Sequence, residues 1–374
     1  MKTVLFVVSE DWYFVSHRLP LAEYAVAQGY QVGVLCNVSD RRSVIEQAGI
    51  DVFDWQLLRK SKNPLNELRS IAILRRCVRS YEPDIIHAVA LKPILYTHLT
   101  TTSSAVRLVS ALGGLGYTFS SDSRMAKALR GVIRIALQRV IRRKNSHIIM
   151  QNPDDMHMLT HVGIQREDGH FSLIPGVGVD HERFHPKASP AQSSRTVIYT
   201  GRLLWDKGMD EFVQVARAIK SSHPTVRFVL AGMRDEHNPE CVPSQVLEQW
   251  CREGVVEWAG YQKDVVKSLH KASVFLFPSY REGFPKAVLE ASSCGLPVVT
   301  FDVPGCREVV NHGTTGYLIP FKDVAKMQAA VRKLLDDHEH ALALGQAGRE
   351  RVLQQYTVKH IADQTLRVWE ARDE

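Results

Sequence analysis

Short, continuously apolar runs alternate with helical patterns along the whole of this 374-residue chain. In the first half the runs are Val4–Val8, Val32–Leu35, Asp84–Val89, Arg107–Leu112, His147–Met150 and Phe171–Ile174. In the second half they are Thr196–Thr200, Val226–Ala231, Val255–Trp258, Val274–Phe277, Pro297–Thr300 and Tyr317–Ile319. Such runs suit strands buried on both faces, and strand–helix alternation produces parallel sheets covered by helices. The sequence therefore predicts an α/β protein with doubly wound parallel sheets.

The length predicts two domains, each with its own core. The stretch from Gly176 to Ser194 is rich in Pro, Gly, Ser and His, which is typical of a hinge. We therefore expect Rossmann-like domains at 1–180 and 195–356, a linker at 181–194, and a C-terminal helix at 357–374 that can cross back to the first domain. Two such domains bind ligands at the carboxyl ends of their strands, across the cleft between them.

The net charge of +7 is unevenly distributed, with +10 in residues 1–150 and −3 in the remainder. The segment from Arg124 to Lys144 holds eight basic residues and no acidic one, interleaved with apolar residues. Such a segment favours contact with anionic lipid or a phosphorylated ligand, and the alternative is a solvated arginine-rich helix over a core. No recognition motif for nucleic acid accompanies the charge, so nucleic acid is not an expected partner.

The six cysteines show neither a C-x-x-C pair nor a metal-ligand spacing, which indicates reduced thiols in a cytosolic protein. The N-terminus enters a strand pattern without the layout of a signal peptide. No run is long and apolar enough to cross a bilayer. We therefore expect a cytoplasmic protein.

Two carboxylates in the stretch from Ser279 to Glu290 are the most informative candidates for a site. Glu282 lies in the loop after the apolar run Val274–Phe277, and Glu290 follows eight positions later in the helix that this loop opens. The spacing alone is weak evidence, because other glutamates in the chain share it. The setting of strand, glycine-containing loop, proline and helix is what gives the pair its meaning.

The start of that helix predicts an anion site. Pro285 suits the first helical position because it has no N–H to leave unpaired. The amides of Gly283, Phe284 and Lys286 would then point beyond the strand end, where a helix N-terminus favours negative charge.

A second loop, Gly201 to Gly208, follows the run Thr196–Thr200 and contains two cations, Arg202 and Lys207. Arginine can bind a diphosphate bidentately and lysine supplies a point charge, although a salt-bridged helix start would give the same pattern. Both loops follow strands of the second half, so both would project into the same cleft. Cations, amides and carboxylates together fit a sugar nucleotide, whose departing diphosphate needs stabilised negative charge.

These motifs resemble those of the retaining, GT-B-fold glycosyltransferases of family 4 over nearly the whole chain. The resemblance is carried by Gly201-Arg202 with Lys207-Gly208, by Glu282-x7-Glu290, and by Pro304–Glu308 with Gly313–Gly316. Two further stretches, Ala111–Phe119 and Gly232–Pro239, are similar to the bacterial capsule, O-antigen and protein-glycan branch. That branch includes enzymes that add N-acetylhexosamine to an undecaprenyl-diphosphate-linked sugar.

The resemblance implies roles for residues of the second half. Arg202 and Lys207 would bind the donor diphosphate, and Glu290 would bond the ribose. Glu282 would lie beside the donor sugar, which makes Glu282, Arg202 and Lys207 the catalytic candidates. Further donor contacts are implied for the amides of Gly283 and Phe284 and for the backbone of Tyr261 and Gln262.

In the first half, the resemblance implies that the loop from Tyr13 to Arg18 faces donor and acceptor. The acceptor or phosphate candidates are Arg18, His17 and Gly114. Many relatives place a histidine at the position of Gly113, so a mechanism that needs it is not expected here. His87 is either a replacement in nearby space or a core histidine at a strand end.

Neither a metal nor a cofactor is expected. The chain has no Asp-x-Asp triplet, and the pairs His157/His161 and His181/His185 lack a nearby group of carboxylates. With cations and amides to hold the diphosphate, no metal is needed for that task.

The resemblance thus implies a hexosyltransferase that moves an N-acetylhexosamine from a UDP-sugar to a polyprenyl-diphosphate-linked glycan, with retention. Its basic first half would meet the anionic inner leaflet, so the enzyme would be peripheral at the cytoplasmic face of the membrane. The alternatives are a GDP-mannose or UDP-glucose transferase with a soluble acceptor, a sugar-nucleotide epimerase of similar fold, and an inactive nucleotide-sugar-binding scaffold.

Overall fold

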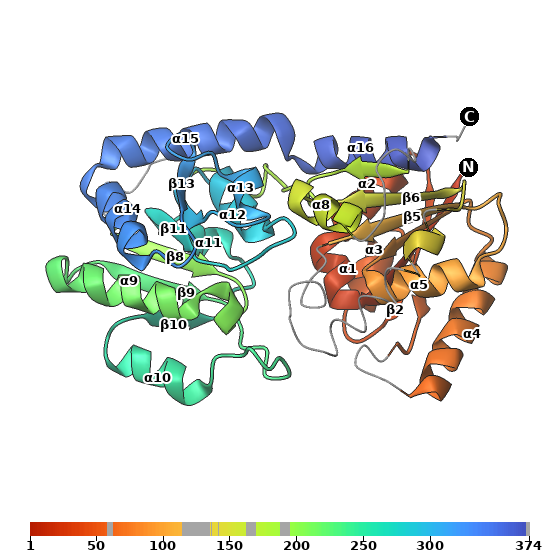
Figure 1. The fold of residues 1–374 in the computed structure, drawn as a ribbon, viewed down its shortest axis with the longest axis horizontal. Coiled ribbons are helices and arrows are strands. Elements are labelled where there is room, and N and C mark those ends of the chain that lie inside the picture. Colours follow the sequence, from red (N-terminus) through yellow and green to blue (C-terminus); the bar gives the residue numbers. More distant parts are fainter. Residues whose placement is uncertain are drawn as a thin grey trace. The chain divides into compact units, whose positions relative to one another are not determined.

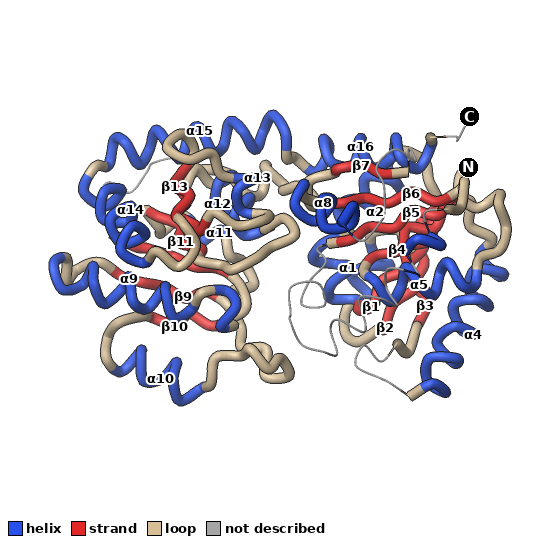
Figure 2. Tube along the Cα trace, in the orientation of Figure 1, coloured by secondary structure: helices blue, strands red, loops and turns tan. Residues whose placement is uncertain are grey.

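The computed structural model describes residues 1–57, 63–113, 135, 137–140, 142–161, 170–187 and 195–371. The chain forms two compact units, one made of Met1–Val177 with Val358–Glu374 and the other of Gly178–Thr357. Figure 1 and Figure 2 show the elements of both.

Residues 178–187 belong to the second unit, although 181–194 was predicted to be a linker. Phe184 is buried in the core of this unit, and its carbonyl accepts hydrogen bonds from Ser293 and Arg349. This anchoring is the physical reason for the difference. Residues 188–194 lie outside the described part of the chain.

The first unit is built on a seven-stranded, entirely parallel sheet (Figure 2). In spatial order its strands are β3 (Asp51–Asp54), β2 (Gln31–Asn37), β1 (Thr3–Glu10), β4 (Ile85–Val89), β5 (Arg107–Leu112), β6 (Ser146–Met150) and β7 (Phe171–Leu173). The helices are α1 (Asp11–His17), α2 (Leu19–Ala27), α3 (Arg42–Gln47), α4 (Pro64–Tyr81), α5 (Leu91–Thr100), α8 (Pro153–His161) and α16 (Val358–Glu370).

Alternate residues of these strands enter two separate cores, one on each face of the sheet. Phe6 of β1 packs in the core that α1, α2, α3 and α16 cover, together with Phe14 and Trp369. Its neighbours Leu5 and Val7 enter the opposite core, beneath α4, α5 and α8. Burial on both faces explains why the strands read as continuous apolar runs.

The second unit has a six-stranded parallel sheet. In spatial order its strands are β10 (Glu257–Gly260), β9 (Arg227–Ala231), β8 (Thr196–Thr200), β11 (Val274–Phe277), β12 (Val298–Phe301) and β13 (Gly316–Ile319). The helices are η2 (Trp205–Lys207), α9 (Met209–Ser222), α10 (Ser244–Arg252), α11 (Val266–Leu269), α12 (Lys286–Ser293), α13 (Cys306–Val309), α14 (Val324–Asp336) and α15 (His338–Gln355).

The prediction of parallel, doubly wound sheets is confirmed, and two of the differences concern strands that lie at sheet edges. β3 was not predicted, because its sequence Asp-Val-Phe-Asp is only partly buried and therefore not continuously apolar. β10 begins two residues later than predicted, since this edge strand is mostly exposed. Among the described residues, no helix combines the length and apolar character needed to cross a membrane.

Candidate functional site

Three turns of the second unit meet at the carboxyl-terminal ends of its strands. They follow β8, β11 and β12, which are neighbours in the sheet, so their carboxyl ends lie side by side. The amide of Tyr280 donates to the carbonyl of Asp206 at 3.0 Å, and the amide of Glu282 donates to the carbonyl of Pro304 at 3.1 Å. Backbone bonds therefore connect the central turn to both of its neighbours.

Two glycines make this close approach possible. Gly208 has φ 72°, and a Cβ there would lie 2.0 Å from the carbonyl oxygen of Pro278. Gly305 has φ 86°, and a Cβ there would lie 2.6 Å from the carbonyl oxygen of Glu282. Any larger residue would separate the turns as well as strain the backbone.

Lys207 and Glu282 form an ion pair between the first and second of these turns. The Lys207 Nζ lies 2.7 Å from the Glu282 Oε1, and the Ser279 hydroxyl donates to the same oxygen at 2.7 Å. Each charged side chain is only 16% exposed. A partly buried pair of this kind holds both groups in place at the strand ends.

Arg202 has a more open position. Its Nη1 lies 3.0 Å from the Asp235 Oδ2, and its side chain is 51% exposed. The Tyr199 hydroxyl donates to the carbonyl of Arg202 at 2.9 Å, which anchors the backbone of the turn. The guanidinium can therefore exchange Asp235 for another anion without losing its backbone support.

Glu290 lies in helix α12, four residues after Lys286, and the Lys286 Nζ is 3.1 Å from its Oε1. The helix begins at Lys286, so Pro285 is its N-cap and the prediction of Pro285 as the first helical residue was wrong by one position. No side chain caps this N-terminus. Its first amides consequently keep the positive end of the helix available to an anion.

The remaining donor candidates lie in flanking positions. Gly283 and Phe284 are in the turn before α12, and the ring of Phe284 lies 5.3 Å from that of Tyr356. Tyr261 and Gln262 follow the edge strand β10, where Tyr261 is 63% exposed. They also follow the carboxyl-terminal end of a strand but make no described contact with Lys207 or Glu282.

In the first unit the predicted loop from Tyr13 to Arg18 is mostly helix, because α1 begins at Asp11 directly after β1. His17 stacks on Tyr13 with ring centroids 4.4 Å apart. Arg18 joins α1 to α2 and is 4% exposed. Gly113 lies beside Tyr13, whereas Gly114 and most of the basic segment from Arg124 to Lys144 lie outside the described residues.

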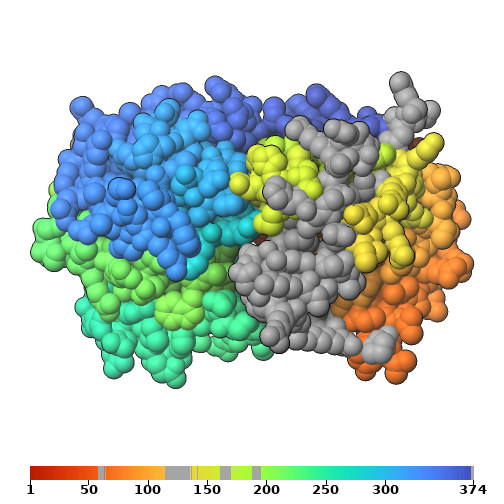
Figure 3. Space-filling model, in the orientation of Figure 1, coloured from red at the N-terminus to blue at the C-terminus, as the bar shows by residue number. Residues whose placement is uncertain are grey.

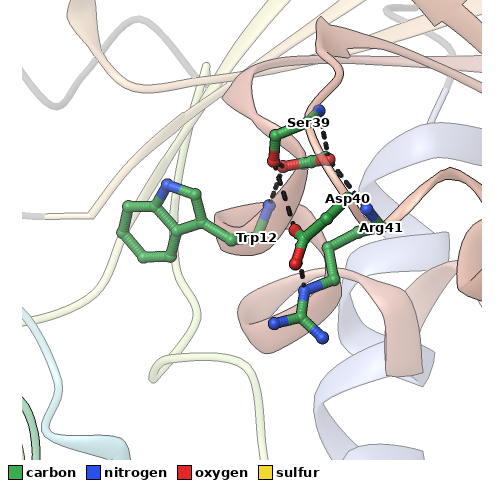
Figure 4. A network of polar contacts seen from close by, with 5 residues as sticks. Trp12, Ser39, Asp40 and Arg41 are labelled. Atoms are coloured by element: carbon green, nitrogen blue, oxygen red, sulfur yellow. Dashed lines mark hydrogen bonds and ion pairs between the residues drawn. The ribbon is translucent and has the colours of Figure 1, made fainter.

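Asp11 is a structural residue that the sequence analysis missed. It is fully buried, and its carboxylate accepts hydrogen bonds from Ser39, from the amide of Arg41 and from the amide of Trp12. Figure 4 labels these three partners. Burial alone would raise the pKa of Asp11, but these hydrogen bonds outweigh it and lower that pKa. The charged carboxylate thus fixes the turn after β2 against the start of α1.

Comparison with known proteins gives the chain its family. Residues 3–152 match the family described as Glycosyl transferase 4-like, and residues 180–351 match the one described as Glycosyl transferases group 1. The chain is a glycosyltransferase of the family 4 type.

One curated relative of this glycosyltransferase matches over nearly its whole length. It is the N,N'-diacetylbacillosaminyl-diphospho-undecaprenol alpha-1,3-N-acetylgalactosaminyltransferase of Campylobacter jejuni, 26% identical over 366 residues, with 94% of each chain covered. Sucrose-phosphate synthase from Thermosynechococcus elongatus has a similar fold, with a TM-score of 0.83, 20% identity and coverage of 99% and 98%. Anabaena Alr3699/HepE, solved with UDP-glucose, has a TM-score of 0.78, 18% identity and coverage of 98% of each chain. The predicted sugar-transferring enzyme and its GT-B fold are confirmed.

At the candidate site, the structure brings Lys207 and Glu282 into direct contact and puts Arg202 on the turn that also carries Lys207. Ser279 and Asp235 were missed as their partners. Ser279 stands three residues before Glu282, and that spacing within a turn was the available signal. Asp235 had no such signal, because its pairing depends on the turn after β9.

Among the described residues, no three metal-ligating side chains gather into a cluster.

Proposed function

We propose that this glycosyltransferase moves an N-acetylhexosamine from a UDP-sugar to a polyprenyl-diphosphate-linked glycan during bacterial polysaccharide or glycan assembly. The observation that carries the proposal is the ion pair of Lys207 with Glu282 at the carboxyl-terminal ends of the strands, with Arg202 on the same turn as Lys207. The relative from Campylobacter jejuni is named for an undecaprenol-linked acceptor, and HepE was solved with UDP-glucose. Both names agree with the ligand classes proposed for this chain.

In the proposed donor complex, the diphosphate takes the position next to Lys207 and Arg202, near the uncapped N-terminus of α12. Two cations and a helix N-terminus stabilise the charge that develops on the departing UDP, so no metal is required. Glu290, which is 12% exposed at its side chain, accepts from the ribose hydroxyls. The turn after β10, with Tyr261 and Gln262, holds the base through its backbone.

The proposed reaction is a front-face displacement with retention. The bond between the sugar C1 and the β-phosphate oxygen breaks while the acceptor oxygen bonds to C1 from the same face. The proton of the acceptor hydroxyl passes to the departing phosphate oxygen. Glu282 lies beside the sugar, where a carboxylate stabilises the positive charge that C1 acquires.

A panel of donors tests this function through the release of nucleoside diphosphate. We expect UDP to be released from a UDP-N-acetylhexosamine only when a polyprenyl-diphosphate-linked sugar is present, with retained configuration in the product. Turnover of GDP-mannose or UDP-glucose with a soluble acceptor would contradict the proposed substrates. A new sugar nucleotide formed without acceptor would indicate an epimerase, and donor binding without any turnover would indicate a scaffold.

The outer face of helix α4 supports a peripheral location at the inner face of the membrane. Leu65 is 72% exposed and Leu68 is 62% exposed near the start of the helix. Four arginines also point to solvent from this helix, namely Arg69, Arg75, Arg76 and Arg79. The helix lies at the surface of the first unit (orange in Figure 3). Exposed leucines beside clustered arginines are suited to an anionic lipid surface.

We therefore expect the protein to bind vesicles that contain anionic lipid and to be released by raised salt. Each arginine near such a surface contributes about 1 kcal/mol, so changing all four to glutamine should weaken binding by more than about 100-fold. Vesicle co-sedimentation measures the effect. A matched control removes four exposed cations of the second unit, namely Arg252, Lys263, Lys267 and Lys326. An equal loss in the control, or binding that salt leaves unchanged, would contradict a role for α4.

A further inference from the structure

The side chain of Tyr280 forms a second connection between the two turns that carry Lys207 and Glu282. Tyr280 stands two residues before Glu282, and its hydroxyl donates to the Oε1 of Glu211 at 2.7 Å. Glu211 belongs to the first turn of α9, four residues after Lys207. The amide of Tyr280 also donates to the carbonyl of Asp206 at 3.0 Å, so this one residue holds the chain on both sides of Lys207.

Glu211 is a buried carboxyl group that the core itself does not require. It is 5% exposed, and its Oε2 has no hydrogen-bond partner among the described residues. The N-terminus of α9 favours an acidic residue but leaves this oxygen unbonded. An apolar side chain would avoid that loss of stability, since a buried polar atom without a hydrogen bond is costly. The bond to Tyr280 therefore explains why a carboxyl group stands at this position.

The ring of Tyr280 is held as well as its hydroxyl. It packs edge-on against Phe321 with centroids 5.3 Å apart, and the Nζ of Lys322 lies 4.8 Å from its centroid. Lys322 has φ 62°, a left-handed conformation that costs free energy in a residue with a Cβ. Strained residues cluster at functional sites, and this one contacts Tyr280. Burial, and next the hydrogen bond to Glu211, raise the pKa of Tyr280, so its hydroxyl keeps the proton that it donates.

We propose that Tyr280 is a positioning residue of the transfer reaction, which keeps Glu282 in place once the donor has bound. The inference rests on the proposed function, in which the diphosphate becomes a partner of the Lys207 ammonium. The ion pair that fixes Glu282 in the free protein is then weakened, and among the described residues the Ser279 hydroxyl is the remaining hydrogen bond to its Oε1. Tyr280 lies between Ser279 and Glu282, so its bond to Glu211 fixes the backbone that carries both.

Replacing Tyr280 with phenylalanine removes the hydroxyl and keeps the ring. We expect kcat to fall by about tenfold, while the KM for the donor and the affinity for UDP change by less than about twofold. The reason is that the lost bond acts on Glu282 and not on the diphosphate. Tyr30→Phe is the matched control, because the Tyr30 hydroxyl donates to the Oε1 of Glu370 at 2.6 Å in the first unit. This control should lose stability to a similar degree and keep its kcat.

Variants of Glu211 separate positioning from stability. Glu211→Gln keeps an oxygen that accepts from Tyr280, so it should retain kcat within about threefold. Glu211→Leu removes the acceptor and should lower kcat as much as Tyr280→Phe does, and the two changes together should lower it no further. The double variant leaves no polar group unpaired at this place, so it should regain the melting temperature that Tyr280→Phe loses. Recovery of kcat together with stability would show a merely structural role and overturn the proposal.

A second readout does not depend on turnover. Hydrogen exchange at the amides of residues 279–283, measured with and without UDP, reports how firmly the turn is held. In Tyr280→Phe we expect this exchange to rise by about tenfold with UDP bound, and by less in the free protein, where the ion pair with Lys207 still holds Glu282. Tyr30→Phe should leave it unchanged. Unaltered exchange in the UDP complex of Tyr280→Phe would overturn the proposal.

Failure of this inference and failure of the proposed function give different results. If another donor or acceptor is used and Tyr280→Phe slows that transfer alike, the proposed substrates are wrong and the positioning role stands. If N-acetylhexosamine is transferred to the lipid-linked acceptor and Tyr280→Phe is as fast as the unaltered protein, the proposed function stands and the positioning role is wrong.

Discussion

Replacing Glu282 with glutamine is expected to lower kcat by about 100- to 1,000-fold while the affinity for UDP changes by less than about threefold. The carboxylate is 16% exposed and its Oε1 is shared by Lys207 and Ser279, so it is a fixed negative charge at the strand ends. An amide keeps its size but cannot stabilise positive charge at the sugar C1. Lys207, released from its partner, is still available to the diphosphate. Steady-state turnover and UDP calorimetry measure the two effects.

The cations of the same site should show the opposite pattern. Lys207→Ala and Arg202→Ala each remove a charged contact to the diphosphate, so the affinity for UDP should fall by about 10- to 100-fold. The matched control for Glu282→Gln is Glu253→Gln, because Glu253 forms a surface ion pair with Arg217 at 2.8 Å outside the three turns. This control should leave both kcat and the affinity for UDP unchanged. Small and equal effects of the changes at Glu282, Lys207 and Arg202 would show that the donor binds elsewhere.

The fold was predictable because its strands are buried on both faces. Runs such as Val274–Phe277 and Thr196–Thr200 coincide with β11 and β8, since every residue of these strands is buried. At the sheet edges this signal is lost. β3 and β10 have exposed residues, so their limits depend on pairing with a neighbouring strand and not on their own composition.

The candidate site was predictable to the level of its turns but not of its contacts. The turns after parallel strands lie at the same end of a sheet, which is why Lys207 and Glu282 could be assigned to one cleft. In the structure β8 and β11 are neighbours, so their turns lie next to each other. That they pair directly, with Ser279 on the same oxygen, depends on the backbone of both turns. The hydrogen bond from the Trp369 indole to the His87 Nδ1, 3.0 Å long, escaped prediction for a similar reason, because 282 residues separate the two side chains.

Replacing Gly208 with alanine should produce the second large effect, on stability and donor binding together. Its φ of 72° costs an L residue about 1–2 kcal/mol, and a Cβ only 2.0 Å from the Pro278 carbonyl oxygen adds about 1–3 kcal/mol of overpacking. Because Gly208 directly follows Lys207, any backbone shift that relieves the contact also displaces the Lys207 ammonium from Glu282. We therefore expect the free energy of unfolding to fall by about 2–5 kcal/mol, measured by urea denaturation, and the affinity for UDP to fall as well.

The chain offers a control that separates these two costs. Gly254 has φ 68°, nearly that of Gly208, but a Cβ there would meet no atom within 4 Å. Gly254→Ala should therefore lose only the conformational part, about 1–2 kcal/mol, and bind UDP normally. The difference between the two variants measures what contact between the first and second turns contributes. If both alanines destabilise the protein equally and neither changes the affinity for UDP, then close packing of Gly208 against Pro278 is not what holds Lys207 beside Glu282.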